Sequence, residues 1–196
     1  MAARRDSSRT KPRRADAERS VARIHEAAIE ALASDPEASM AEIARRAGVV
    51  RATVYVHFPT REALLGAITE RAIEDVTGEI AAAEPERGEP AEALRRVVAA
   101  AWRSLGRFHS LVAINTRLSD VELRHRHASP RAVLEPLIER GQRDGAFRAD
   151  VPATWHLTMI LALIHAASGE LRAEHVPPEQ VEAALLATVL GAVSAR

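Results

Sequence analysis

The chain has 196 residues, a formal net charge of zero, 47% hydrophobic residues and no cysteine. Its apolar content is enough for a hydrophobic core, and the lack of cysteine excludes disulfides and zinc sites built on thiolates. The longest nearly apolar run, residues 157–167, is far shorter than the roughly 20 residues of a membrane span, so we expect a soluble, cytoplasmic protein.

The charge is distributed unevenly along the chain. Residues 1–62 contain 12 Lys and Arg against 9 Asp and Glu, whereas residues 63–196 contain 15 against 18. No apolar segment follows the basic N-terminus, which therefore lacks the pattern of a secretory signal. We expect residues 1–15 to form a flexible basic arm that either binds phosphates or acts as a solubilising tail. Its cations are Arg4, Arg5, Arg9, Lys11, Arg13 and Arg14.

The first helix is predicted from about Asp16 to Ala33. An apolar stripe at helical spacing runs along this segment, and the pair Asp35-Pro36 ends it. The stripe consists of Val21, Ile24, Ala28, Ile29 and Leu32.

Residues 39–65 carry the most informative pattern. Ser39 followed by Glu42 has the spacing of a capping box, which predicts that a short helix begins there. Gly48 supplies the permissive backbone that the end of this helix needs. A second short helix is predicted over about residues 50–57. Two short helices joined by a tight turn after a longer helix indicate a three-helix helix-turn-helix domain.

The second short helix has two different faces. Val54 and Phe58 are spaced to point inward, whereas Arg51, Thr53 and His57 are displayed near one another on the outside. In a helix-turn-helix the first helix braces the second, which presents such polar and basic side chains to the major groove of DNA.

A strand is the alternative for residues 53–58, because they are rich in β-formers and roughly alternate in polarity. However, no partner segment with turn residues at hairpin spacing lies nearby, and helical patterns flank the segment on both sides. We therefore interpret it as a helix. An extended ribbon here would remove the DNA-binding interpretation.

The motifs in this segment are Ala47-Gly48-Val49, Thr53-Val54-Tyr55, His57-Phe58-Pro59-Thr60-Arg61-Glu62 and Leu64-Leu65. Together they resemble the DNA-binding signature of TetR-family transcriptional regulators. The resemblance is strong over about residues 19–65 and extends beyond them only to length and an all-helical pattern. It implies a homodimer, usually a repressor, which leaves its DNA operator when a small ligand binds in the C-terminal domain.

Arg51 is the strongest candidate for a base contact, because a guanidinium pairs bidentately with guanine. The resemblance implies phosphate contacts for Tyr55 and His57, and packing within the domain is the alternative for Tyr55. Thr53 has the chemistry to contact a thymine methyl or a phosphate. The full set of predicted DNA-binding residues is Ser39, Arg45, Val50, Arg51, Ala52, Thr53, Tyr55, His57, Thr60 and Arg61.

Helix ends account for several members of this set. Thr60 is a good cap for the following helix, and Arg61 adds a cation where free backbone N–H groups favour an anion. Ser39 has the same potential at the start of its helix, besides its role as a cap. Val50 departs from the small polar residue usual in the family, so the recognition helix is expected to lack a side-chain cap.

We divide the chain into residues 1–15 (the arm), 16–62 (the helix-turn-helix domain) and 63–196 (a helical regulatory and dimerisation domain), which makes the fold all-α. The C-terminal domain is predicted to contain a helix after Thr60 to about Ala83, then a loop over residues 84–90. Ser129 is expected to cap a later helix, with Pro130 in its first turn. Further helices are predicted over about residues 91–108, 109–118, 153–173 and 178–195.

The helices at about residues 153–173 and 178–195 are unusually apolar. A helix that is apolar almost all round must be covered on more than one side. Burial within one subunit is one solution. The more economical solution is a four-helix interface between two copies of the chain.

A ligand pocket is expected in the C-terminal domain from the resemblance, but its residues are weakly specified by the sequence. Aromatic and polar side chains on the surrounding helices are the candidates, and each has core packing or plain exposure as its alternative. They are Trp102, Phe108, His109, Asn115, Arg117, Trp155, His156 and Met159.

No metal, cofactor or catalytic site is predicted. His125 and His127 are two residues apart and would point to different faces of a helix. The sequence contains no glycine-rich phosphate loop and no nucleophile elbow. The sequence therefore predicts a non-enzymatic, homodimeric regulator that binds a double-stranded operator and is released by a small effector. A ligand-independent DNA-binding protein and an all-helical binding or enzyme module that does not use DNA are the alternatives.

Overall fold

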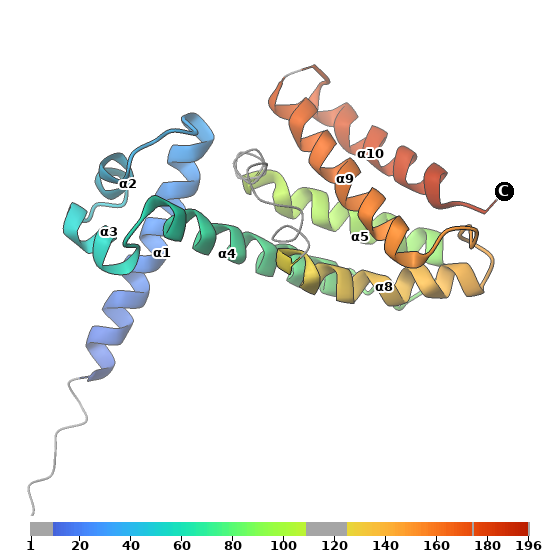
Figure 1. Cartoon of the computed structure of the whole chain (residues 1–196), viewed down its shortest axis with the longest axis horizontal. Coiled ribbons are helices and arrows are strands. Elements are labelled where there is room, and N and C mark those ends of the chain that lie inside the picture. Colours follow the sequence, from blue (N-terminus) through green and yellow to red (C-terminus); the bar gives the residue numbers. More distant parts are fainter. Residues whose placement is uncertain (1–9, 109–124, 174, 196) are drawn as a thin grey trace, which may run out of the picture. The chain divides into compact units, whose positions relative to one another are not determined.

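The computed structural model describes residues 10–108, 125–173 and 175–195. Every regular element in these ranges is a helix, as predicted, and the chain divides into two compact units, Met1–Ile68 and Thr69–Arg196. Figure 1 shows these helices coloured along the sequence. The boundary lies inside one helix, α4 (Arg61–Ala82), which contributes its first turns to unit 1 and the rest to unit 2.

Unit 1 contains α1 (Thr10–Ser34), α2 (Met40–Arg46), α3 (Arg51–His57) and the start of α4. The α1 helix begins earlier than the predicted start near Asp16. The strand alternative for the segment after Thr53 is wrong, because it is helical to His57. Apolar side chains from all four helices form the core of this unit: Ile24, Ala28, Leu32, Ile43, Ala44, Val54, Leu64 and Ile68, with Phe58 from the α3–α4 turn.

The turn between α2 and α3 is closed by backbone hydrogen bonds. Gly48 has a φ of 63°, a conformation that costs glycine little, and its N–H donates to the Arg45 carbonyl at 3.2 Å. The Val49 N–H donates to the Ala44 carbonyl at 3.1 Å. These two bonds form the Schellman pattern that satisfies the end of a helix. The turn therefore fixes α3 directly against the helix that precedes it.

Unit 2 contains the remainder of α4, α5 (Pro90–Leu105), the short 3₁₀ helix η1 (Gly106–Phe108), α8 (Ala128–Arg143), α9 (Ala153–Arg172) and α10 (Pro178–Val193). In Figure 1, α9 and α10 lie side by side, and they pack against each other. Ser129 lies within the first turn of α8 and does not cap it, because the N-cap is His127. The predicted helix over residues 109–118 lies outside the described residues. The core of the unit includes Leu94, Val97, Trp102, Leu137, Ile138, Phe147, Leu157, Ile160, Leu185 and Val189.

Two guanidinium groups hold the loop between α4 and α5. Arg140 on α8 donates to the carbonyls of Gly88, at 2.6 Å, and Pro85, at 2.9 Å. Arg96 on α5 donates to the carbonyls of Arg87, at 2.9 Å, and Glu84, at 3.1 Å. These four carbonyls would otherwise be left to solvent, so the end of α4 is fastened to the body of unit 2.

The segment after α8 is fixed by the ring of Phe147, which lies close against the backbone of Gly141. Gly141 is buried, and a Cβ added to it would lie 2.0 Å from the Phe147 ring. The N–H of Phe147 donates to the Gly141 carbonyl, and the next residue, Arg148, donates to the carbonyl of Val193 at the end of α10. None of the described helices is long and apolar enough to span a membrane.

Candidate DNA-binding surface and effector cavity

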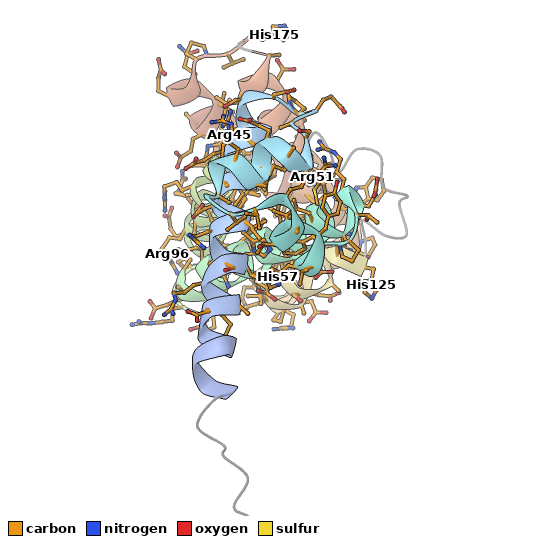
Figure 2. All side chains as sticks on the ribbon, turned by 90° about the vertical axis from the view of Figure 1, so that its left-hand side faces the viewer. Arg45, Arg51, His57, Arg96, His125 and His175 are labelled. Atoms are coloured by element: carbon orange, nitrogen blue, oxygen red, sulfur yellow. The ribbon has the colours of Figure 1, made fainter. Side chains whose placement is uncertain are left out.

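The recognition helix α3 is short, and its exposed face is mostly polar or small. Arg51 and Ala52 are exposed, Thr53 and His57 are half-buried, and Val54 is fully buried. Val50 caps the helix without a side-chain hydrogen bond, as expected. Figure 2 shows Arg51 and His57 on the outside of unit 1, and Arg45 on α2.

Arg51 is held in place by its neighbour one turn along the helix. Its guanidinium donates to the Tyr55 hydroxyl at 3.0 Å and lies 5.2 Å from the centre of the Tyr55 ring. Both the hydrogen bond and the cation–π contact restrict the rotamers of a long side chain. Tyr55 is itself 37% exposed, so its hydroxyl stays at the surface. The pair presents a guanidinium that is partly ordered before DNA arrives.

A carboxylate sits between two arginines on α2. Glu42 accepts hydrogen bonds from Arg45, at 2.6 and 2.8 Å, and from Arg46, at 2.8 Å. These hydrogen bonds, that from Arg45 first, lower the pKa of Glu42 to about 2. The predicted capping box is therefore half formed: the Ser39 hydroxyl accepts from the Glu42 N–H at 3.2 Å, while the Glu42 side chain turns to the arginines. The trio carries one net positive charge.

The N-terminus of α4 is occupied by groups of the chain itself. The Thr60 hydroxyl accepts from the Ala63 N–H at 3.1 Å, which forms the predicted cap. The Glu62 carboxylate accepts from its own backbone N–H and from Thr60, which lowers its pKa. Arg61 donates to the carbonyls of Ala38 and, at 2.6 Å, Pro36, so it ties α4 to the loop between α1 and α2. Arg61 thus has a structural role that the sequence did not indicate.

The sequence-based prediction passed over Val56, which is 78% exposed on α3. A large apolar side chain this exposed on a recognition helix is a candidate for contact with a thymine methyl. The signal was available, because Val56 and Ala52 are four residues apart and share a face of the helix. His57 lies beside Phe58, whose ring centre is also 5.3 Å from that of His25 on α1, in a tilted arrangement.

Unit 2 contains a partly open cavity of about 80 Å³. Aliphatic side chains from several helices line most of it, and Phe108 also lines it. The polar side chains among the described lining residues are Thr69, His127 and His165. The lining residues on α4 are Thr69, Ala72, Ile73, Val76 and Ile80.

The two histidines of the cavity contact each other. The ring centres of His127 and His165 are 5.3 Å apart, in an edge-to-face arrangement. Burial, and then the neighbouring His127, lower the pKa of His165 to about 4. The His165 imidazole is therefore neutral at pH 7, and it has no hydrogen-bond partner among the described residues.

Comparison with known proteins identifies the family. The sequence model described as "Bacterial regulatory proteins, tetR family" matches residues 24–68, which span the helix-turn-helix. The uncharacterized HTH-type transcriptional regulator Rv2250c of Mycobacterium tuberculosis is 32% identical over 157 residues, covering 78% of this chain and 79% of that relative. The chain belongs to the TetR family of transcriptional regulators. It is accordingly a DNA-binding regulator and not an enzyme.

A second TetR-family relative is similar in both sequence and structure. The HTH-type transcriptional repressor LfrR of Mycolicibacterium smegmatis is 40% identical over 81 residues, covering 41% of this chain and 43% of LfrR. The crystal structure of LfrR from Mycobacterium smegmatis in complex with proflavine matches 91% of this chain and 99% of that chain, with a TM-score of 0.70 and 26% identity. This match extends the likeness from the DNA-binding unit to the helical C-terminal unit.

The structure places the predicted effector residues of this TetR-family protein in different environments. Phe108 lines the cavity, whereas Trp102 is buried in the core and Met159 packs against that core. His156 is buried, with its Nε2 3.0 Å from the Arg148 carbonyl, and Trp155 is 59% exposed. His109, Asn115 and Arg117 lie outside the described residues. The sequence-based prediction missed His127 and His165 at the cavity, since only tertiary packing brings residues so far apart in the chain together.

Proposed function

We propose that this TetR-family regulator is a homodimeric repressor, which a small-molecule effector bound in the cavity releases from its operator. The observation that carries the proposal is the continuity of α4. This helix begins at Arg61, packed in the helix-turn-helix unit, and farther along it lines the cavity. An occupant of the cavity would therefore press on the same helix that supports the DNA-binding unit.

The anchoring of α4 supports this coupling. Its last turn leads into the loop that Arg96 and Arg140 hold by four hydrogen bonds. A helix fastened at its C-terminal end and pushed along its middle moves most at its N-terminal end. In a dimer, that movement changes the separation of the two recognition helices. A coupling of about 1–3 kcal/mol is typical of such linkage.

The outward faces of α9 and α10 suit a second copy of the chain. Residues 153–169 of α9 and 183–193 of α10 contain no Asp, Glu, Lys or Arg. The exposed residues on these stretches are mostly small, so two such faces can approach closely without burying charge. The exposed small residues are Ala162, Ala166, Ala183, Ala184, Ala187 and Gly191.

A dimer would present two α3 helices to successive major grooves of a near-palindromic operator. Arg51 would read a base, while Thr53, Tyr55, His57 and the α2 arginines would contact the DNA around it. Because phosphate contacts release counterions, operator affinity should fall steeply with salt. The similarity to LfrR, which is named a repressor, supports the negative sign of regulation.

The test begins with an operator selected from a random DNA pool and measured by fluorescence anisotropy. Small molecules that raise the unfolding temperature of the protein are then added to the complex. The proposal expects at least one of them to weaken operator binding by about 5- to 150-fold. Stabilising compounds that leave operator affinity unchanged would instead support a ligand-independent DNA-binding protein.

A variant links the release to the cavity. Ala101 is buried on α5 and lines the cavity, so Ala101→Leu should fill part of it and block release while operator binding persists. Ala91 is exposed near the start of the same helix, and Ala91→Leu is the matched control.

Sedimentation of Ala187→Arg tests the dimer, since one arginine on each facing α10 should separate the subunits. A wild-type protein that sediments as a lone subunit at working concentration would overturn the dimer.

A further inference from the structure

We propose that the cavity takes a neutral, largely apolar molecule whose single hydrogen-bonding group, such as a hydroxyl or carbonyl, lies at the His127–His165 end. This inference rests on the proposed function only for the effect of the ligand on operator binding, because binding of the ligand to the cavity is measurable without DNA. It assigns a ligand class to the cavity and a recognition role to His165.

The wall of the cavity determines the apolar body of the ligand. Aliphatic carbons from α4, α5, α8 and α9 face the space, and they include Val76 and Val97, both largely or fully buried. Such a wall stabilises apolar groups by removing them from water, at about 25 cal/mol per Å². It offers nothing to compensate the desolvation of a charged group placed against it.

The histidine pair determines where a polar group lies. His165 on α9 and His127 before α8 contact each other in the wall of the cavity, where Thr69 on α4 is the other polar side chain among the described lining residues. A neutral imidazole has one N–H donor and one nitrogen acceptor. His165 uses neither in a hydrogen bond to any described residue, so it can serve a ligand hydroxyl or carbonyl without losing a partner.

The protonation state of His165 favours a neutral group over an anion. A carboxylate ligand would be matched best by a protonated, cationic His165. Because the pKa of His165 is about 4, protonating the ring at pH 7 would carry a penalty that lowers the affinity for a carboxylate by about a thousandfold. The attraction between the charges then does little more than offset that penalty. An ammonium group fares worse, because imidazole offers it a single lone pair within the apolar wall.

The size of the cavity limits the first ligands that will enter. At about 80 Å³ it is smaller than the roughly 150 Å³ engineered cavity that accommodates benzene, but it is partly open, so narrow flexible chains that can extend toward the open side are the suitable probes. Larger ligands require the walls to move, and α4 forms one of those walls.

The probes are therefore 1-hexanol, hexanoate and hexylammonium, each titrated into the full-length protein by calorimetry at pH 7.5. We expect hexanol to bind at least about tenfold more tightly than either ion. We also expect its binding enthalpy to be the same in phosphate and Tris buffers, because no proton is exchanged. Tighter binding of either ion, or failure of hexanol to bind at millimolar concentration, would overturn the inference.

The variant test is His165→Leu, with His175→Leu as the matched control on an exposed histidine. Loss of one neutral hydrogen bond should weaken hexanol binding about fivefold in His165→Leu and leave it unchanged in His175→Leu. An equal change in both variants, or no change in either, contradicts the role of His165. If hexanol binds as expected but does not release operator DNA, the ligand class stands and the proposed effector function fails.

Discussion

The two units of this protein hold their functional residues in opposite ways. In the helix-turn-helix, the recognition helix α3 carries its candidate contact residues within two helical turns of sequence, and Arg51 and Tyr55 are exposed neighbours one turn apart. In the C-terminal unit, the cavity is apolar and its polar pair, His127 and His165, comes from distant parts of the chain. Changes in the first region should therefore alter DNA binding with little effect on stability. Changes in the C-terminal unit should alter its stability, and they should affect DNA binding only indirectly, through α4.

The largest expected effect is a pH dependence that originates at His165. Its pKa falls from 6.5 to about 4 on folding, so the folded state binds this proton less readily than the unfolded state. The resulting stability is intact above about pH 6.5 and declines as the pH falls toward 4, by roughly 3 kcal/mol in total. In His165→Gln this component is absent. Urea unfolding of both proteins should therefore give a difference in unfolding free energy that changes by about 3 kcal/mol between pH 7.5 and 4, and a constant difference would contradict the neutral state of this partly buried histidine.

The next effect concerns the packing of Phe147 on Gly141. Any Cβ at position 141 would overlap the ring, so Gly141→Ala should destabilise the C-terminal unit by about 1–3 kcal/mol. A Cβ added to Gly78 on α4 would meet no atom within 4 Å, and Gly78→Ala is the matched control. Chemical denaturation measures both. Equal stability of the two variants would show that the ring moves aside freely.

In the other region, Arg51→Ala should relax specificity at one base pair and cost about 1–3 kcal/mol of operator affinity. Tyr55→Phe sharpens the test, because it removes the hydroxyl that accepts from Arg51 but keeps the ring under the guanidinium. It should weaken binding less than Arg51→Ala and leave base preference intact. Anisotropy on operators with single base changes distinguishes the two. An unchanged affinity of Arg51→Ala on every sequence would refute its role in base recognition.

The same contrast explains what the sequence could reveal. The capping hydroxyl of Ser39, the turn at Gly48 and the inward pair Val54 and Phe58 depend on spacings of a few residues, and all were predicted from the sequence. The role of Arg61 was not, because its partners Pro36 and Ala38 are brought close only by folding.

The cavity was harder still to predict. The sequence favours aromatic and polar residues as ligand candidates, but most of the described ones pack in the core or face solvent, as Trp102 and Trp155 do. A wall of Ala, Val, Ile and Leu looks in sequence like any helix core. Only packing decides which of these side chains face a cavity and which histidines meet at its end.

The smallest expected effect tests whether the Glu42 carboxylate reduces the positive charge of the DNA-binding surface enough to weaken nonspecific binding. Glu42 is ionised at any physiological pH, since its pKa is about 2, and it engages both Arg45 and Arg46. In Glu42→Gln the two guanidiniums keep a neutral partner but lose the charge that opposes phosphate. Affinity for unrelated duplexes should rise about two- to fivefold, with a steeper dependence on salt. Glu30→Gln makes the same charge change on an exposed position of α1, so an equal gain there would mean that net charge alone is responsible. A gain confined to Glu42→Gln would indicate that the carboxylate restrains nonspecific binding and so leaves more of the discrimination between sequences to Arg51.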